Sequence, residues 1–148
     1  VHGDYHLGQI LVKEDDFYIL DFEGEPESTI RDRKVKQPPL KDVAGLFRSF
    51  HYAIYATLFN NSELYNHSQT DLFKAGELLY RYIIGLFLGT YTEIIQEANL
   101  NIGYNQERIF LLKYSLLEKA VYELGYELNS RPQWAIIPLK GIANNINN

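Results

Sequence analysis

The first nine residues of the chain concentrate side chains that can do chemistry. The stretch "HGDYHLGQ" (residues 2–9) holds two imidazoles, a carboxylate and an amide, and Asp21 follows an apolar run twelve positions after Gln9. Phosphoryl transfer from a nucleotide needs few protein groups, namely a carboxylate that accepts the proton of the attacking hydroxyl and oxygen ligands for magnesium. The spacing therefore makes Asp4 the candidate catalytic base, and Gln9 and Asp21 the candidate magnesium ligands.

The same stretch allows a second interpretation, a zinc or manganese site of a metal hydrolase. His2, Asp4 and His6 alternate, so on a strand they would share one face, and imidazole with carboxylate suits either metal. This interpretation gives Gln9 and the later acids no function. Each histidine can instead form hydrogen bonds with the loop backbone, and His2 is for that reason the candidate for structural support.

Two short β-prone runs follow, over residues 9–13 and 17–22, with a polar Glu-Asp-Asp spacer between them. This pattern predicts a hairpin, which would bring Gln9 and Asp21 to the same rim. The segment over residues 23–39 contains Gly24, Pro26 and the pair Pro38-Pro39, so we expect a loop, in which the charged run over residues 31–34 is solvated.

Beyond residue 39 the apolar residues recur at helical spacing. The expected helices cover about residues 40–60, 71–96, 106–129 and 133–144, and Pro138 either kinks the last helix or marks its true start. The predicted fold class is mainly α with one small β-hairpin. We expect a single domain over residues 1–148, with the hairpin and its loops in residues 1–39 and a helical part in residues 40–148.

Composition limits the classes of function. The chain has 148 residues, 46% hydrophobic and 22% charged, which is typical of a globular protein with a buried core. A net charge of -5 argues against a nucleic acid or an anionic membrane as partner, and the most apolar segment, residues 82–89, is too short to span a bilayer. Without methionine or a secretory signal, the chain is expected to be an internal piece of a longer cytoplasmic protein.

One helix face has the character of a sugar-binding wall. Lys119, Tyr122 and Tyr126 fall at positions i, i+3 and i+7, so they share a face that offers donors and aromatic rings to a pyranose. Glu127 is a further candidate one position on. The alternative is that the tyrosines are core residues and that Lys119 lies in solvent.

The motifs at the start of the chain resemble a known family. "HGDYHLGQIL" together with "YILDFEGEP" is similar to the catalytic and metal loops of aminoglycoside-phosphotransferase-like kinases, and more closely to those of the maltokinases, which phosphorylate maltose with ATP. The segments over residues 39–53 and 117–142 resemble later helices of that family, and residues 56–109 carry the least specific part of the likeness. Related kinases usually have Asn where this chain has Gln9, whereas the maltokinase-like pattern uses Gln.

The resemblance implies the helical C-terminal lobe of a protein-kinase-like fold that uses ATP and Mg²⁺, with the nucleotide-clamping N-terminal lobe of the same protein missing from this chain. It implies Asp4 as catalytic base, and Gln9 and Asp21 as magnesium ligands. Glu23 is either an additional metal ligand or a solvated loop acid. Asp42 resembles an aspartate that holds the catalytic loop from below, although a first-turn carboxylate is also favoured by the helix dipole alone.

Three functions remain in competition. The first is a sugar kinase that converts maltose and ATP to maltose 1-phosphate. The second is a kinase of another small hydroxyl acceptor, such as an aminoglycoside, whose pocket would need more acids, or choline, whose pocket would need an aromatic cage. The third is a binding module that has kept the fold without activity, against which the presence of Asp4, Gln9 and Asp21 argues.

Overall fold

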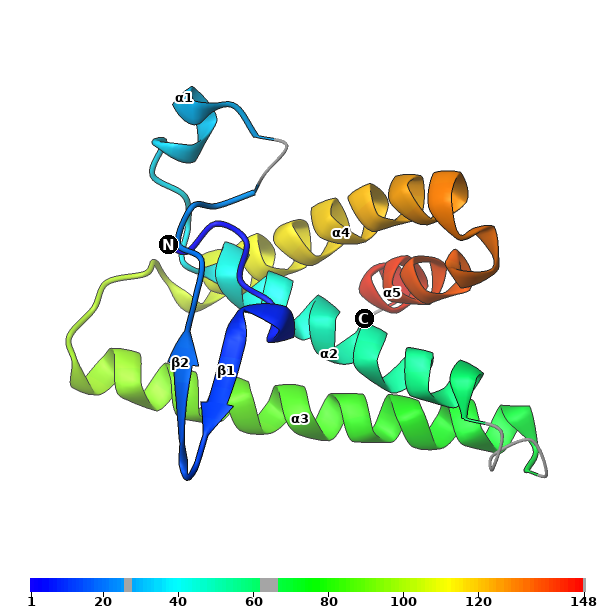
Figure 1. Cartoon of the computed structure of the whole chain (residues 1–148). Helices are drawn as coiled ribbons and strands as arrows, with labels where there is room; N and C mark the ends of the chain where they lie inside the picture. Colours follow the sequence, from blue (N-terminus) through cyan, green and yellow to red (C-terminus); the bar gives the residue numbers. More distant parts are fainter. Residues whose placement is uncertain (26–27, 62–66, 148) are drawn as a thin grey trace. The chain divides into compact units, whose positions relative to one another are not determined.

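A computed structural model describes residues 1–25, 28–61 and 67–147 of the chain. These residues are mostly helical and contain one two-stranded hairpin, so the predicted fold class is confirmed (Figure 1). They group into two compact units, the first made of residues 1–49 and 103–148 and the second of residues 50–102. The expectation of one domain over residues 1–148 stays a prediction.

The hairpin is short and starts directly after the loop that contains Asp4. A 3₁₀ turn, η1 (Leu7–Gln9), leads into β1 (Ile10–Lys13), which pairs antiparallel with β2 (Asp16–Ile19). Ile10 lies opposite Ile19, and the carbonyl of Gln9 accepts a 2.8 Å hydrogen bond from the Leu20 N–H. The predicted hairpin is therefore confirmed, with strands slightly shorter than the β-prone runs.

Between the hairpin and the first long helix, the described residues contain one short helix, α1 (Ile30–Arg33). The charged run was expected to be a loop, and this part of the prediction is wrong. Thr29 is the reason, because its side-chain oxygen accepts a hydrogen bond from the Asp32 N–H and so caps a helical turn. The side chains of the run are exposed, as expected.

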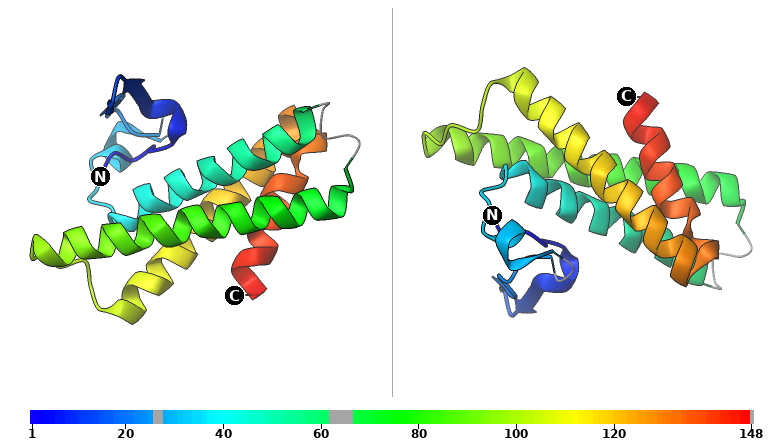
Figure 2. Two further views of the ribbon diagram at one scale, coloured as in Figure 1. Left: turned by 90° about the horizontal axis from the view of Figure 1, so that it is seen from below. Right: turned by 90° about the horizontal axis from the view of Figure 1, so that it is seen from above.

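The first unit is built around α2 (Leu40–Asn60), α4 (Asn105–Ser130) and α5 (Ile136–Asn147), with the 3₁₀ turn η3 (Pro132–Trp134) between the last two. Residues 40–49 of α2 belong to this unit. Figures 1 and 2 show α4 and α5 packed against each other. Pro138 lies in the first turn of α5, where no intrahelical N–H is needed, so it marks a helix start and no kink. The buried apolar residues of this unit are Leu40, Val43, Ala44, Leu46, Phe47, Ala120, Ala135 and Ile137.

The second unit consists of residues 50–60 of α2 and the long helix α3 (Gln69–Glu97). An aromatic cluster of Tyr55, Phe59 and Phe73 joins the two helices, with ring centroids 5.7 to 6.5 Å apart. By length and composition α3 is also the one helix, in the described ranges, that could cross a membrane, and 11% of its most apolar window is buried. Such a lone helix is weak evidence for a span, and the absence of a membrane partner stays a prediction.

Candidate active site

The loop that carries Asp4 is held by a carboxylate on α2. The N–H groups of His2 and Gly3 donate hydrogen bonds of 2.6 and 2.9 Å to the two oxygens of Asp42. Asp42 lies in the first turn of α2, where the helix dipole also favours a negative charge. These contacts are the ones that the expected support of the catalytic loop requires, and the role itself stays a prediction.

His2 connects this loop to the end of the hairpin. The residue is 8% exposed, and its Nε2 lies 2.7 Å from the carbonyl oxygen of Leu20. Its Nδ1 accepts a 3.3 Å hydrogen bond from the Asp4 N–H, so Nε2 is the nitrogen that donates to Leu20. Because backbone groups occupy both ring nitrogens, His2 has none left for a metal, and the hydrolase site with His2, Asp4 and His6 is not formed.

Two glycines permit the close approach of these segments. A Cβ at Gly45 of α2 would lie 2.5 Å from the carbonyl oxygen of Tyr5, too close for any other residue without backbone movement. Gly24, in the turn after β2, has a φ of +81° that L side chains rarely adopt, and its Cα would lie 3.2 Å from a Cβ at Gly3. The loop that contains Asp4 is therefore packed between α2 and the turn that follows the hairpin.

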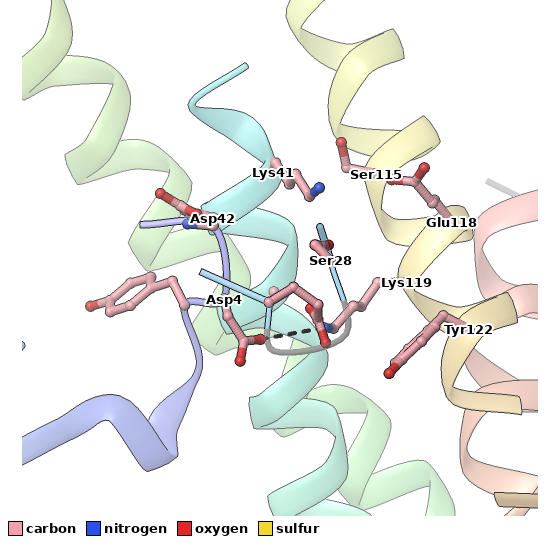
Figure 3. Close-up of a pocket in the computed structure, with 12 residues that line it drawn as sticks. Asp4, Ser28, Lys41, Asp42, Ser115, Glu118, Lys119 and Tyr122 are labelled. Atoms are coloured by element: carbon pink, nitrogen blue, oxygen red, sulfur yellow. Dashed lines mark hydrogen bonds and ion pairs between the residues drawn. The ribbon is translucent and has the colours of Figure 1, made fainter. Parts of the chain in front are cut away.

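A pocket of about 370 Å³ opens beside this loop, within the size range of small-molecule sites (Figure 3). Carboxylates outnumber ammonium groups among its lining side chains. The charged and polar lining residues are Asp4, Tyr5, Glu25, Ser28, Lys41, Asp42, Ser115, Glu118, Lys119 and Tyr122. The pocket therefore offers an acid-rich surface on which a polar acceptor with several hydroxyl or amino groups could be bound.

Lys119 is the residue at which the two sides of the pocket meet. Its Nζ lies 2.9 Å from Oε2 of Glu25 and 3.5 Å from Oδ1 of Asp4, and it stands 5.3 Å from the centroid of the Tyr122 ring (Figure 3). Burial acts against the charged ammonium, but the hydrogen bond to Glu25 and the nearby carboxylates outweigh it and raise the pKa of Lys119. The ammonium is therefore held in its charged form beside the candidate base.

The two candidate magnesium ligands lie together at one end of the hairpin. Nε2 of Gln9 donates a 3.1 Å hydrogen bond to Oδ2 of Asp21. Asp21 has a φ of 59°, a conformation in which Asp and Asn are enriched among residues other than glycine. An amide oxygen and a carboxylate are hard ligands of the kind that Mg²⁺ prefers, so the residue types of this pair fit the ion, although the Gln9 group that faces Asp21 here is the NH₂ and not the oxygen. Glu23 is exposed in the same turn, and its proposed metal role stays a prediction.

Two residues of the predicted sugar-binding face do not reach the pocket. Tyr126 lies seven residues after Lys119, so it shares the angular face but sits about 10 Å further along the helix axis. Its ring faces the guanidinium of Arg131, 5.8 Å from the centroid. Glu127 is 1% exposed and forms a 2.7 Å ion pair with Arg131. Lys119 and Tyr122 remain as the candidate wall.

Sequence reasoning missed Glu25, Glu118, Ser28, Ser115 and Lys41, all of which line the pocket. Glu118 could have been predicted, because it directly precedes Lys119, which was already a candidate sugar-binding residue. Glu25 carried one signal, as the second acid of the "DFEGEP" turn. Nothing in the local pattern distinguished Ser28, Ser115 or Lys41 from ordinary polar surface residues.

The described chain has the fold of one part of solved sugar-kinase structures. It superimposes with a TM-score of 0.79 on a glucosamine kinase (crystal form A), at 22% identity over 97% of this chain and 31% of that one. The TM-score is 0.76, again at 22% identity, with a glucosamine kinase in complex with glucosamine, ADP and inorganic phosphate, over 97% of this chain and 34% of that one.

The curated proteins to which this chain is similar are also sugar kinases. The chain is 24% identical over 138 residues to a glucosamine kinase of Streptacidiphilus jiangxiensis, and 27% identical over 138 residues to one of Mycolicibacterium smegmatis. Both matches cover 93% of this chain, which spans only 29% and 32% of the two relatives. No family model matches the chain. The relatives agree with the expectation of a sugar kinase, and neither is named a maltokinase.

Proposed function

We propose that this chain carries the catalytic base, the magnesium ligands and part of the acceptor wall of an ATP-dependent sugar kinase. The observation that carries the proposal is the position of Asp4, which lines the acid-rich pocket 3.5 Å from Lys119 and belongs to the loop that leads into Gln9. The glucosamine kinase relatives support the same chemistry. Because the chain spans about a third of their length, the activity is proposed for the whole protein, in the cytoplasm, where ATP is present.

In the proposed reaction, the carboxylate of Asp4 accepts the proton of the acceptor hydroxyl while that oxygen forms a bond to the γ-phosphorus of ATP. The bond between this phosphorus and the bridging oxygen breaks, ADP leaves with the bridging oxygen, and the proton passes from Asp4 to solvent. Magnesium held by Gln9 and Asp21 would neutralise phosphate charge. Asp42 orients the loop that presents Asp4.

An amino sugar is the acceptor that the pocket supports best. Four carboxylates (Asp4, Glu25, Asp42 and Glu118) line it against two lysines (Lys41 and Lys119), which favours an acceptor with a protonated amine. The relatives named glucosamine kinase support the same choice. Maltose was expected from the motif resemblance, and no relative reported above bears that name, so it becomes the comparison acceptor.

The test is a kinase assay of the full-length protein with ATP and Mg²⁺ against glucosamine, glucose, maltose, an aminoglycoside and choline. We expect kcat/KM for glucosamine to exceed that for glucose by at least roughly tenfold, since the acids would pair with the amine. Asp4→Asn should abolish most of the turnover with any acceptor. If maltose is the better substrate, the acceptor assignment is wrong, and if no acceptor is phosphorylated, the chain belongs to a silent kinase-like module.

The 148-residue chain alone should show no turnover of ATP, because most of the nucleotide-binding surface would lie in the remainder of the protein. If this chain alone released ADP in the presence of an acceptor, and Asp4→Asn abolished that release, the proposed location of the nucleotide-binding surface would be wrong.

A further inference from the structure

Glu25 makes the shortest contact with Lys119. Its Oε2 lies 2.9 Å from Nζ, whereas the nearest oxygen of Asp4 is 3.5 Å away. The side chains of Lys119, Glu25 and Asp4 are 29%, 25% and 14% exposed, so the three charges are partly shielded from water. Glu25 is therefore the main partner of an ammonium group that lies between two acids of different function.

The turn that presents Glu25 is fixed by the backbone. Asp21 at φ 59° and Gly24 at φ 81° give the turn its shape, and Gly24 packs against Gly3 of the catalytic loop. Glu25 follows Gly24 directly. Its carboxylate thus extends from a turn that packs against the loop of Asp4.

Lys119 needs such a partner, because an ammonium on a flexible four-carbon stem is not fixed by its helix alone. Without the Glu25 carboxylate, Asp4 would be the remaining carboxylate within 4 Å of the Lys119 ammonium among the described residues, since Glu123, the other acid that acts on Lys119, is paired with Arg48. A direct ion pair with Lys119 would stabilise the ionised carboxylate of Asp4 and make it a poorer proton acceptor. It would also occupy the space in front of Asp4 that an acceptor hydroxyl needs.

We propose that Glu25 is a positioning residue of the acceptor pocket: it holds the Lys119 ammonium at the wall, near the Tyr122 ring, and prevents it from forming a tight ion pair with Asp4. The inference rests on the proposed function, in which Asp4 is the base. It assigns a role to an acid that is neither the base nor a magnesium ligand.

The kinetic test uses the full-length protein with glucosamine as acceptor. Glu25→Gln keeps the size of the side chain and removes its charge, so Lys119 is free to pair with Asp4, and kcat should fall by roughly tenfold. Adding Lys119→Met removes the competing ammonium, so the double variant should recover kcat relative to Glu25→Gln, although its KM for glucosamine should exceed that of the wild type because the acceptor wall has lost Lys119. Asp15→Asn, which removes an exposed acid in the hairpin turn, is the matched control and should keep wild-type kinetics.

Recovery of kcat in the double variant distinguishes a positioning role of Glu25 from a merely structural one. If Glu25→Gln acted by destabilising the fold, a second substitution would not restore turnover. The proposal is overturned if Glu25→Gln leaves kcat unchanged or if the double variant is no faster than the single one.

A second measurement is independent of catalysis and so distinguishes failure of this inference from failure of the proposed function. In protein whose lysines carry ¹³C-methyl groups, the NMR signal of Lys119 should move little on Asp4→Asn in the wild-type background. It should move clearly on Asp4→Asn in the Glu25→Gln background. Equal shifts in the two backgrounds would show that Glu25 does not keep the ammonium from Asp4.

Discussion

The backbone N–H of His2 donates a 2.6 Å hydrogen bond to the carboxylate of Asp42, forty positions later in the chain. The other oxygen of Asp42 accepts a 2.9 Å hydrogen bond from the N–H of Gly3. One side chain in the first turn of α2 therefore fixes two consecutive amides of the loop that continues into Asp4. A carboxylate is well suited to this task because it accepts at both oxygens and donates at neither.

Asp42→Asn tests this contact. The amide keeps the shape but turns one acceptor oxygen into an NH₂ group that faces an N–H donor, so we expect a loss of about 1.5–3 kcal/mol in the free energy of unfolding, measured with urea. The control is Asp71→Asn, an exposed first-turn carboxylate of α3, which should cost less than about 1 kcal/mol. Equal losses would mean that Asp42 acts only through the helix dipole.

Gly141→Ala tests the packing of α5 on a buried ion pair. A Cβ at Gly141 would overlap the guanidinium of Arg48, which is locked by hydrogen bonds of 2.8 and 2.6 Å to Oε2 of Glu123. Although Ala is the better helix former, we expect a net loss of about 1–3 kcal/mol. Gly125→Ala on α4 meets no atom within 4 Å and should stabilise by about 0.5–1 kcal/mol. Thermal unfolding of both variants checks the prediction, and stabilisation by both would contradict it.

We expect Glu123 to make the free energy of unfolding depend on pH. Burial raises the pKa of Glu123, and the Arg48 guanidinium at 2.6 Å only partly offsets this. The folded protein thus holds this proton to higher pH than the unfolded chain, so stability falls as pH rises from the ordinary pKa of glutamate through the raised value.

Glu123→Gln should therefore flatten the decline of the unfolding free energy across this window, by up to about 1.4 kcal/mol per pH unit, the value for one proton. Urea titrations at a series of pH values between about 4 and 8 measure the slope. Glu118→Gln, an exposed acid of the same helix, should keep the wild-type slope. Identical slopes for Glu123→Gln and the wild type would show that Glu123 is ionised equally in both states.

Much of the fold was predictable because it is encoded by local patterns. Two β-prone runs around a polar spacer predicted the hairpin, and since a hairpin fixes its register, the approach of Gln9 and Asp21 followed from the same pattern. Helical periodicity gave α2, α3 and α4 within two residues of their observed ends. The capped turn at Thr29 was missed because its signal is a single side chain.

The site was less predictable where it depends on contacts between distant segments. Glu25 and Lys119 stand 94 positions apart, and an acid beside a single glycine in a turn has no local feature that separates it from a solvated one. Tyr126 lies outside this pocket for a different reason, because spacing on a helix gives the direction of a side chain but not whether the pocket extends another two turns, and its contact with the sugar stays a prediction. Pocket length is set by packing and not by periodicity.

Asp21→Asn tests the magnesium site. Asn also tolerates the positive φ of this position, so the variant keeps the backbone and changes one ligand. In the full-length protein, the free Mg²⁺ needed for half-maximal activity at fixed ATP should rise by at least about tenfold. Asp15→Asn in the hairpin turn should leave the Mg²⁺ requirement unchanged. An unchanged requirement in Asp21→Asn would remove Asp21 from the metal site.

Tyr122→Phe separates acceptor binding from packing on α4. Tyr122 lines the pocket beside Lys119, so loss of its hydroxyl, which leaves no cavity, should raise KM for glucosamine by roughly 5–30-fold, or about 1–2 kcal/mol, with little change in kcat. Tyr126→Phe is the matched control, since Tyr126 lies on the same helix, is also exposed and does not line the pocket. Steady-state kinetics and thermal unfolding of both variants distinguish acceptor binding by Tyr122 from a role in packing. If Tyr122→Phe lowers the melting temperature while KM stays at the wild-type value, the tyrosine is a packing residue and the acceptor wall must lie elsewhere in the pocket.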